Sequence, residues 1–185
     1  ERCNSPKCAM IRRPQRPGPH GAKRHSVSEY GAQLQEKQKI KFSYGVTERQ
    51  LKKVFQNAAG SKGISAIETI TRFLESRLDN VVMRLGLVDS RSIARNMTSH
   101  GHFLVNGKKV TTPSYQVKPG DTITIKESSK NMSVFEDIKN KLKNYQTPTW
   151  LSLNQDTLEG KVESQPKDVD FPFNINLVVD YYSKK

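Results

Sequence analysis

The first half of the chain carries apolar side chains every three or four positions, the spacing typical of amphipathic helices. The pattern predicts a helix from Ser28, a capping residue, to about Phe42, with Gly45 as its stop. Two capping-box patterns, at residues 47–50 and 65–68, predict the starts of two further helices. The apolar positions of these helices are Leu51, Val54, Phe55, Ala58, Ile67, Ile70 and Leu74, continued by Leu78, Val82 and Leu85.

Another short helix is predicted between Ser90 and Gly101, because glycine readily takes the left-handed conformation that ends a helix. Its inward positions are expected to be Ile93, Ala94 and Met97, and its outward positions Arg91 and Arg95. Beyond Gly101 the spacing of apolar residues changes from that of a helix to the alternation typical of strands. Residues 103–106 and 108–111 flank Asn106-Gly107, the strongest short hairpin signal in a sequence.

The remaining elements alternate in type. The pattern predicts a turn at residues 118–121, a β-branched strand at 122–126, a helix at 134–142, and short strands at 150–153 and 175–182. Helices followed by antiparallel strands predict an α+β fold.

Residues 1–27 look unlike a packed domain, because Pro6, Pro14, Pro17 and Pro19 exclude a regular helix. Residues 1–27 also hold seven Lys and Arg side chains. An extended basic arm of this kind gains little from burial and much from lying on phosphates. Since the chain begins with Glu1 and not Met, its first residues are expected to have been lost, processed or left out.

The charge is uneven along the 185 residues. The chain has 31 Lys and Arg against 18 Asp and Glu, a net charge of +13. Residues 1–60 hold 13 basic and 4 acidic side chains, residues 61–130 hold 11 and 6, and residues 131–185 hold 7 and 8. A solvated charged face explains single clusters but not this gradient, so a polyanion is the expected partner of the first 130 residues.

Several classes of protein are excluded. No apolar run is long enough to span a membrane, no secretory signal is present, and two cysteines fit a reducing interior. No phosphate-binding glycine loop, nucleophile elbow or His-Glu-x-x-His motif occurs, so nothing indicates an enzyme or a small-molecule substrate. Arg77-Leu-Asp79 also occurs around the catalytic aspartate of some pseudouridine synthases. Asp79 is explained more simply by the dipole of the helix that it begins.

Cys3 and Cys8, with His20 and His25, nearly match the spacing of a zinc finger. The prolines occupy the positions where the finger's helix would lie, which argues against it. Two cysteines alone cannot complete a tetrahedral site, so the alternatives are a half-site with further ligands upstream of Glu1, or unliganded thiols.

A basic helix followed by a basic hairpin favours RNA as the binding partner. Arg91 and Arg95 precede His100-Gly-His102, and the hairpin carries Lys108 and Lys109. Structured RNA is recognised mostly by shape, backbone and 2′-hydroxyls, so such a surface needs charge in rigid positions. Each histidine alone is more often structural than functional.

The motifs resemble a known family. Residues 77–126 are similar to the small αL RNA-binding domain, through Arg-Leu-Asp-Asn-Val-Val, Ser-Arg-Ser-Ile-Ala-Arg, His-Gly-His-Phe-Leu-Val-Asn-Gly-Lys-Lys-Val and Val-Lys-Pro-Gly-Asp. With Cys-Asn-Ser-Pro-Lys-Cys-Ala-Met, Gln-Leu-Gln-Glu-Lys-Gln-Lys and Trp-Leu-Ser-Leu, the whole chain resembles bacterial-type ribosomal protein four of the small subunit.

The resemblance implies a structural protein of the cytoplasmic small ribosomal subunit that is not an enzyme. It implies binding to the 5′ domain of small-subunit rRNA, nucleation of the subunit body, an influence on translational accuracy, and self-repression in some members. The implied neighbours are ribosomal proteins five and twelve and the messenger RNA where it enters the ribosome. Family members with cysteines near the start use two pairs to bind zinc or an iron–sulfur cluster; Cys3 and Cys8 match the second pair.

The resemblance also implies a fold and a set of contact residues. It predicts an arm (1–27), a helical domain (28–78 with 146–185) and an inserted αL domain (79–145) of two helices and a small antiparallel sheet. The expected RNA-binding residues are Arg12, Arg13, His20, Lys23 and Arg24 in the arm, Tyr30, Gln33, Lys37, Gln38 and Lys41 in the first helix, and Arg77, Arg91, Arg95, His100, His102, Asn106, Lys108 and Lys109 in the αL domain.

Overall fold

The computed structural model describes residues 8–15, 17–22, 26–59, 65–132, 135, 138, 142, 145–166 and 171–183. Its helices are α1 (Ala9–Arg12), α2 (Glu29–Tyr44), α3 (Glu48–Ala59), α4 (Ala66–Glu75), α5 (Leu78–Arg84), α6 (Arg91–His100), the 3-10 turn η1 (Glu127–Ser129) and α9 (Ile175–Ser183). Its strands are β1 (Phe103–Val105), β2 (Lys108–Lys109), β3 (Thr122–Ile125), β4 (Leu151–Asn154) and β5 (Glu159–Val162).

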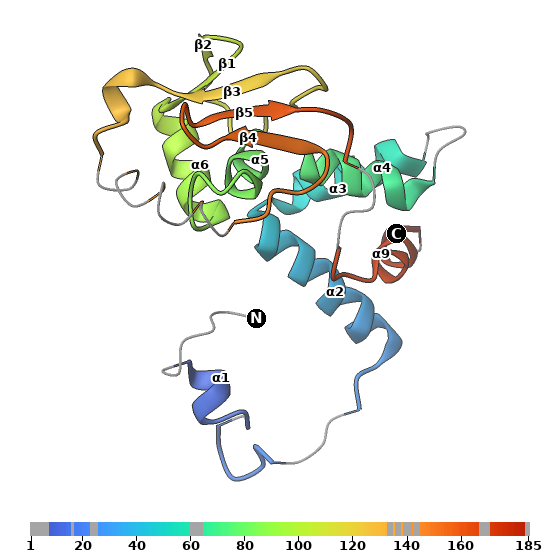
Figure 1. The fold of residues 1–185 in the computed structure, drawn as a ribbon. Helices are drawn as coiled ribbons and strands as arrows, with labels where there is room; N and C mark the ends of the chain where they lie inside the picture. Colours follow the sequence, from blue (N-terminus) through green and yellow to red (C-terminus); the bar gives the residue numbers. More distant parts are fainter. Residues whose placement is uncertain are drawn as a thin grey trace.

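The five strands form one antiparallel sheet in the order β2-β1-β3-β5-β4. Helices α5 and α6 lie against one face of this sheet, and we call the sheet with these two helices the sheet part (Figure 1). Helices α2, α3, α4 and α9 gather beside it and form the helical part. The α+β class predicted from the sequence is confirmed.

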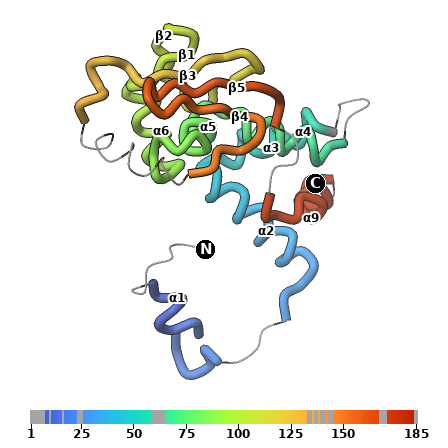
Figure 2. Tube along the Cα trace, viewed as in Figure 1, coloured from blue at the N-terminus to red at the C-terminus, as the bar shows by residue number. Residues whose placement is uncertain are grey.

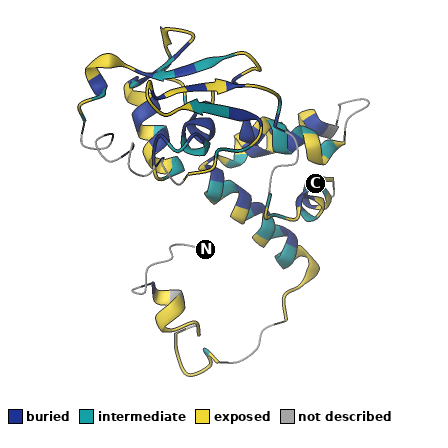
Figure 3. Cartoon of the chain, in the orientation of Figure 1, coloured by how far each residue is buried: buried dark blue, intermediate teal, exposed yellow. Residues whose placement is uncertain are grey.

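Each part has its own hydrophobic core. In the sheet part, α5 and α6 bury Val81, Leu85 and Ala94 against Phe103 and Ile123 of the strands. In the helical part, Ile40 of α2 packs with residues of α3, α4 and α9, among them Leu51, Ile70, Ile175 and Val178. Exposed residues concentrate on α1 and the segment that leads to α2 (Figure 3).

The C-terminal third of the chain is shared between the two parts. Strand β5 pairs with β3, and Trp150 and Leu151 lie in the core of the sheet part. Only the segment that includes α9 returns to the helical part, where α9 lies beside α2 (Figure 2). The expectation that all of residues 146–185 completes the helical domain is therefore corrected for residues 150–162, because their strands extend the sheet.

Most predicted helix boundaries are confirmed by backbone geometry. The Ser28 hydroxyl accepts a hydrogen bond from the Gly31 N–H, and Thr47 and Gln50 form the reciprocal capping box. Gly45 and Gly101 end α2 and α6 in the left-handed conformation. The second predicted capping box does not form, because Ser65 makes no side-chain cap hydrogen bond.

The hairpin forms at Asn106-Gly107 as predicted. Both residues have positive φ angles, 51° and 75°, which a two-residue hairpin turn of type I′ requires. Val105 pairs with Lys108 across the turn.

Three local predictions were wrong. The segment expected as a strand at 175–182 is helix α9, which buries Ile175, Val178 and Tyr181 at a spacing of three residues. Ile93, expected to face inward, is 36% exposed, because Ala94, Met97 and Thr98 form the buried side of α6. The arm contains one helical turn, α1, before Pro14. The helix predicted at 134–142 lies largely outside the described residues.

Close contact between α5 and β5 leads to a test of the core. A Cβ atom at Gly160 would lie 2.4 Å from Leu85 Cδ1, whose side chain is fully buried. We expect Gly160→Val to lower the free energy of unfolding by about 1–3 kcal/mol or more, because the buried leucine has no space to move away. Urea unfolding followed by circular dichroism measures this loss. Lys161→Val, on the exposed side of the same strand, is the matched control, and equal unfolding free energies for the two variants would contradict the assignment.

Candidate RNA-binding surface

The β1–β2 hairpin holds two exposed lysines on a rigid support. Lys108 and Lys109 form β2 at the edge of the sheet, and both side chains are exposed. Asn106 fixes the turn beside them: its Nδ2 donates to Asp121 Oδ1 (2.8 Å) and its Oδ1 accepts from the Thr122 N–H (2.9 Å). The two lysines are therefore placed for a partner, whereas Asn106 holds the turn.

The two histidines at the corner between α6 and β1 differ in environment. His100 is exposed, whereas His102 is half-buried and its Nδ1 lies 2.8 Å from Ser129 Oγ. Burial lowers the pKa of His102, and the nearby His100, Lys126 and Lys109 lower it further. His102 is therefore a neutral structural residue near neutral pH, and His100 is the one open to solvent.

Gly101 permits this corner to form. Its φ is 74°, and a Cβ atom there would lie 2.0 Å from Lys109 Cε. The Lys109 stem therefore lies across the glycine, which positions the hairpin against the end of α6.

The arginines of α6 point toward the helical part. Arg91 Nε donates to Asn80 Oδ1 (2.7 Å), and the Arg91 guanidinium lies 4.6 Å from the centre of the Tyr44 ring. Arg95 donates to the carbonyl of Gly45. Both side chains remain partly exposed, but their bonds hold α6 to the end of α2.

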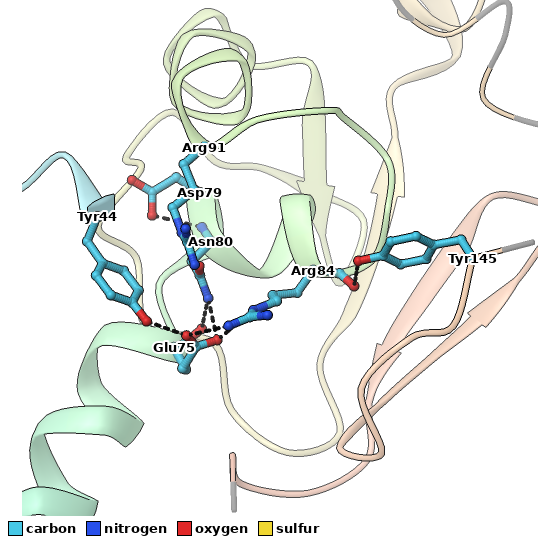
Figure 4. Close-up of polar contacts among 7 residues, drawn as sticks. All are labelled: Tyr44, Glu75, Asp79, Asn80, Arg84, Arg91 and Tyr145. Carbon is cyan, nitrogen blue, oxygen red and sulfur yellow. Dashed lines mark hydrogen bonds and ion pairs between the residues drawn. The ribbon is translucent and has the colours of Figure 1, made fainter. Parts of the chain in front are cut away.

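A buried carboxylate, Glu75, joins the two parts (Figure 4). Glu75, at the end of α4, is fully buried and accepts hydrogen bonds from Tyr44, from Asn80 Nδ2 (2.8 Å) and from the Arg84 guanidinium (3.1 Å). The donors come from α2 and α5, and Asn80 in turn accepts from Arg91 of α6. We call Glu75, Tyr44, Asn80, Arg84 and Arg91 the junction network.

Opposing influences set the ionisation of this network. Burial alone would raise the pKa of Glu75, but the hydrogen bonds from Arg84, Tyr44 and Asn80 outweigh it and hold that pKa below its ordinary value. Burial and the neighbouring carboxylate raise the pKa of Tyr44, so its phenol stays neutral and donates. Glu75 is therefore an ionised, fully partnered residue within the protein.

Arg77 and Asp79 are paired with one another. Both are buried, and the Arg77 guanidinium donates to both Asp79 oxygens, at 3.0 and 2.5 Å. Asp79 also accepts from the Asn80 N–H. Arg77 was expected to face RNA, but its side chain is buried and paired within the protein. The Asp79 carboxylate is likewise not open to a substrate.

Two of the five residues expected on α2 lie on its buried side. Gln33 and Lys37 are buried: Lys37 Nζ lies 3.0 Å from Glu48 Oε1 and 4.6 Å from the centre of the Tyr181 ring. Tyr30 lies beside Tyr181, with ring centres 5.7 Å apart. The predicted solvent-facing roles of Gln33 and Lys37 are therefore corrected, because α9 covers that side.

Two other expected residues of α2 remain partly accessible. Gln38 is half-buried, and Lys41 lies 3.9 Å from Glu48. The exposed positions on α2 that were not among the expected contact residues include Gln35, Lys39 and Phe42. Their spacing of i, i+4 and i+7 is the signal that would have identified them.

The arm and α3 provide further exposed cations. Arg12, Arg13 and His20 are exposed, and Lys23 and Arg24 lie outside the described residues. Arg49, Lys52 and Lys53 line the exposed side of α3, which sequence analysis had not singled out. Lys118 and Lys126 add exposed charge beside the sheet.

Metal binding stays a prediction. Cys8 is buried, and Cys3 lies outside the described residues. In the part of the chain that the structure describes, no three His, Cys, Asp or Glu side chains are grouped to hold a metal ion. One described sulfur does not fit a complete tetrahedral site, so no role is derived through a metal. Among the described helices, none has the length and apolarity to cross a bilayer.

The arrangement defines a basic protein with positively charged side chains on rigid elements, the class that binds structured nucleic acid. Residues 1–75 match the family described as ribosomal protein S4/S9 N-terminal domain, and residues 76–123 match the S4 domain. Relatives named small ribosomal subunit protein uS4A include those of Alkaliphilus metalliredigens (48% identical) and Clostridium botulinum (50%). The uS4 of Caldicellulosiruptor bescii is 48% identical. Each alignment covers 100% of this chain and 89% of the relative.

The chain belongs to the ribosomal protein S4 family, whose members include the small-subunit protein uS4. It is therefore an RNA-binding structural protein of the ribosome and not an enzyme. The sheet part coincides largely with the S4 domain, and β4 and β5 complete its sheet from beyond the matched residues.

The junction network leads to a test by pH. Because the pKa of Glu75 is lower in the folded protein, its contribution to stability is present above its ordinary value of 4.5 and is lost as pH falls through the folded value. We expect Glu75→Gln to lower the free energy of unfolding near pH 7 by about 3 kcal/mol, since it leaves the Arg84 guanidinium without its counter-charge. The variant is also expected to lose less further stability in acid than the parent protein.

Urea unfolding at a series of pH values between 7 and roughly 3 measures both effects. Glu68→Gln, on the exposed side of α4, is the matched control and is expected to follow the parent profile. An unchanged pH profile for Glu75→Gln would contradict the role of the network.

Proposed function

We propose that this chain binds the 5′ domain of small-subunit rRNA early in the assembly of a bacterial ribosome and nucleates the body of the subunit. The single observation that supports this most strongly is the exposed, rigid pair Lys108 and Lys109 on a family-matched S4 domain. The arm, with Arg12 and Arg13, adds an extended cation-rich segment. A cell holding this protein would carry it in its cytoplasmic small subunits.

The physical basis is charge placed at fixed positions. RNA helices display phosphates and 2′-hydroxyls, and a protein reads their shape by setting cations at matching distances. The hairpin turn, the α6 cap and the junction network each hold one part of this surface in place. Preorganisation reduces the entropy lost on binding, so the same lysines bind more tightly than they would on a mobile chain.

We further propose neighbours and consequences that follow from the family. Ribosomal proteins five and twelve and the messenger RNA where it enters the subunit are the expected contacts beyond rRNA. Through them the protein would influence the accuracy of translation. Binding to its own messenger RNA, with repression of its translation, is a further expected activity. No part of this proposal depends on a metal at Cys3 and Cys8.

Binding of the full chain to transcripts of small-subunit rRNA tests the function. The 5′ domain alone is expected to bind tightly, and affinity is expected to fall about 10³-fold between low and moderate salt if six or more phosphates are contacted. An unrelated folded RNA of equal length is the control. Equal affinity for both RNAs at physiological salt would contradict specific recognition.

The hairpin lysines provide a sharper test. We expect Lys108→Ala with Lys109→Ala to weaken binding to the 5′ domain and to reduce the slope of log K against log salt by about 1 to 2, because up to two phosphate contacts are lost. Filter binding over a salt series measures the slope.

Lys37→Ala is the matched control for this test. One positive charge is removed, but Lys37 is buried against Glu48, so the salt slope is expected to stay at the parent value while thermal stability falls. A salt slope unchanged by loss of the two hairpin lysines would remove the hairpin from the proposed interface.

A further inference from the structure

Phe42 has an environment that folding does not explain. In the described part of the chain it is the most exposed of the large apolar side chains, at 74%. Its ring has no aromatic partner among the described residues, whereas Tyr30, at 55%, lies against Tyr181. The cation of Lys41 lies 5.8 Å from the centre of the Phe42 ring.

The position of Phe42 on α2 separates it from the core. Lys37, Ile40 and Tyr44 belong to the buried side of the helix, which α3, α4 and α9 cover. Phe42 follows Lys39 on the opposite, exposed side. The core of the helical part is complete without the Phe42 ring, so its exposure in water is not offset by any packing within the described chain.

The surrounding charge indicates the kind of partner. Two lysines lie within one helical turn before Phe42. The Lys39 side chain is 57% exposed and pairs with Glu36, and the Lys41 side chain is 27% exposed and lies 3.9 Å from Glu48. Protein interfaces are depleted of lysine near their apolar centres. An aromatic ring among cations is instead the arrangement by which proteins bind single-stranded nucleic acid, with a base on the ring and phosphates on the cations.

We propose that Phe42 is a stacking site for one unpaired base of small-subunit rRNA, with Lys39 and Lys41 contacting the phosphates that flank this base. The proposal rests on the proposed function, since it assigns a further contact to the same RNA. It adds a contact with a base to a surface that otherwise presents mainly charge. The exposed side of α2 therefore faces the RNA, with its last turn nearest the unpaired nucleotide.

Binding of Phe42 variants to the 5′ domain transcript tests the proposal. We expect Phe42→Ala to weaken binding about 5- to 100-fold, the effect of losing one stacked base, without changing the salt slope. Phe42→Trp is expected to retain the affinity, and Phe42→Leu to lose nearly as much as alanine, because leucine has no π-face. The variants are expected to fold normally, since alanine and leucine favour a helix more than phenylalanine.

Three comparisons separate the outcomes. Ile67→Ala, a 40% exposed apolar residue on α4, is the control and is expected to leave binding unchanged. Lys39→Ala is expected to reduce the salt slope by about 1, unlike Phe42→Ala. Chemical probing of unpaired bases is expected to show protection of one nucleotide by the parent protein that Phe42→Ala loses.

Other results would overturn the proposal. Full affinity of Phe42→Ala or Phe42→Leu for the transcript, with the parent protein binding tightly, would remove stacking and leave the proposed function intact. Normal RNA binding by Phe42→Ala, combined with failure to enter reconstituted subunits, would assign Phe42 to a protein neighbour. Failure of the parent protein to prefer the 5′ domain would instead reject the proposed function itself.

Discussion

The carboxylate of Glu75 is the constraint on which the arrangement of the two parts depends. An ionised group with no access to water needs several close donors, because the free energy of losing hydration is large. Tyr44, Asn80 and Arg84 supply them, and Arg91 orients Asn80. Since the donors belong to α2 and α5 and the carboxylate to α4, a rotation of one part against the other would leave a buried charge unpaired. The distance between the exposed cations of the two parts is thereby fixed.

Local signals in the sequence predicted local structure well. Ser28, the Thr47–Gln50 capping box, Gly101 and Asn106-Gly107 act within a few residues of chain, so the sequence alone specifies their geometry. The basic character of the surface followed from the composition, and the α+β class followed from the spacing of the apolar residues. The family resemblance then supplied the function, which single residues did not define.

The sequence predictions were wrong where contacts between distant segments determine secondary structure or side-chain exposure. Residues 175–182 are rich in β-branched and aromatic side chains, which favour a strand when considered alone. Packing against α2 makes them helical, and the same contact buries Gln33 and Lys37. Arg77 and Arg91 were expected to face RNA because of the family resemblance. Their partners Asp79, Asn80 and Tyr44 became visible only in three dimensions.

The return of the chain to α2 has a consequence for biosynthesis. Translation proceeds from the amino terminus, so α2 leaves the ribosome before the S4 domain is made, and α9 leaves after it. Until then the helical part lacks the segment that contacts Lys37 and closes its core. The S4 domain can complete its sheet with β4 and β5 first. All strands of the sheet part are thus synthesised before the helix that closes the core of the helical part.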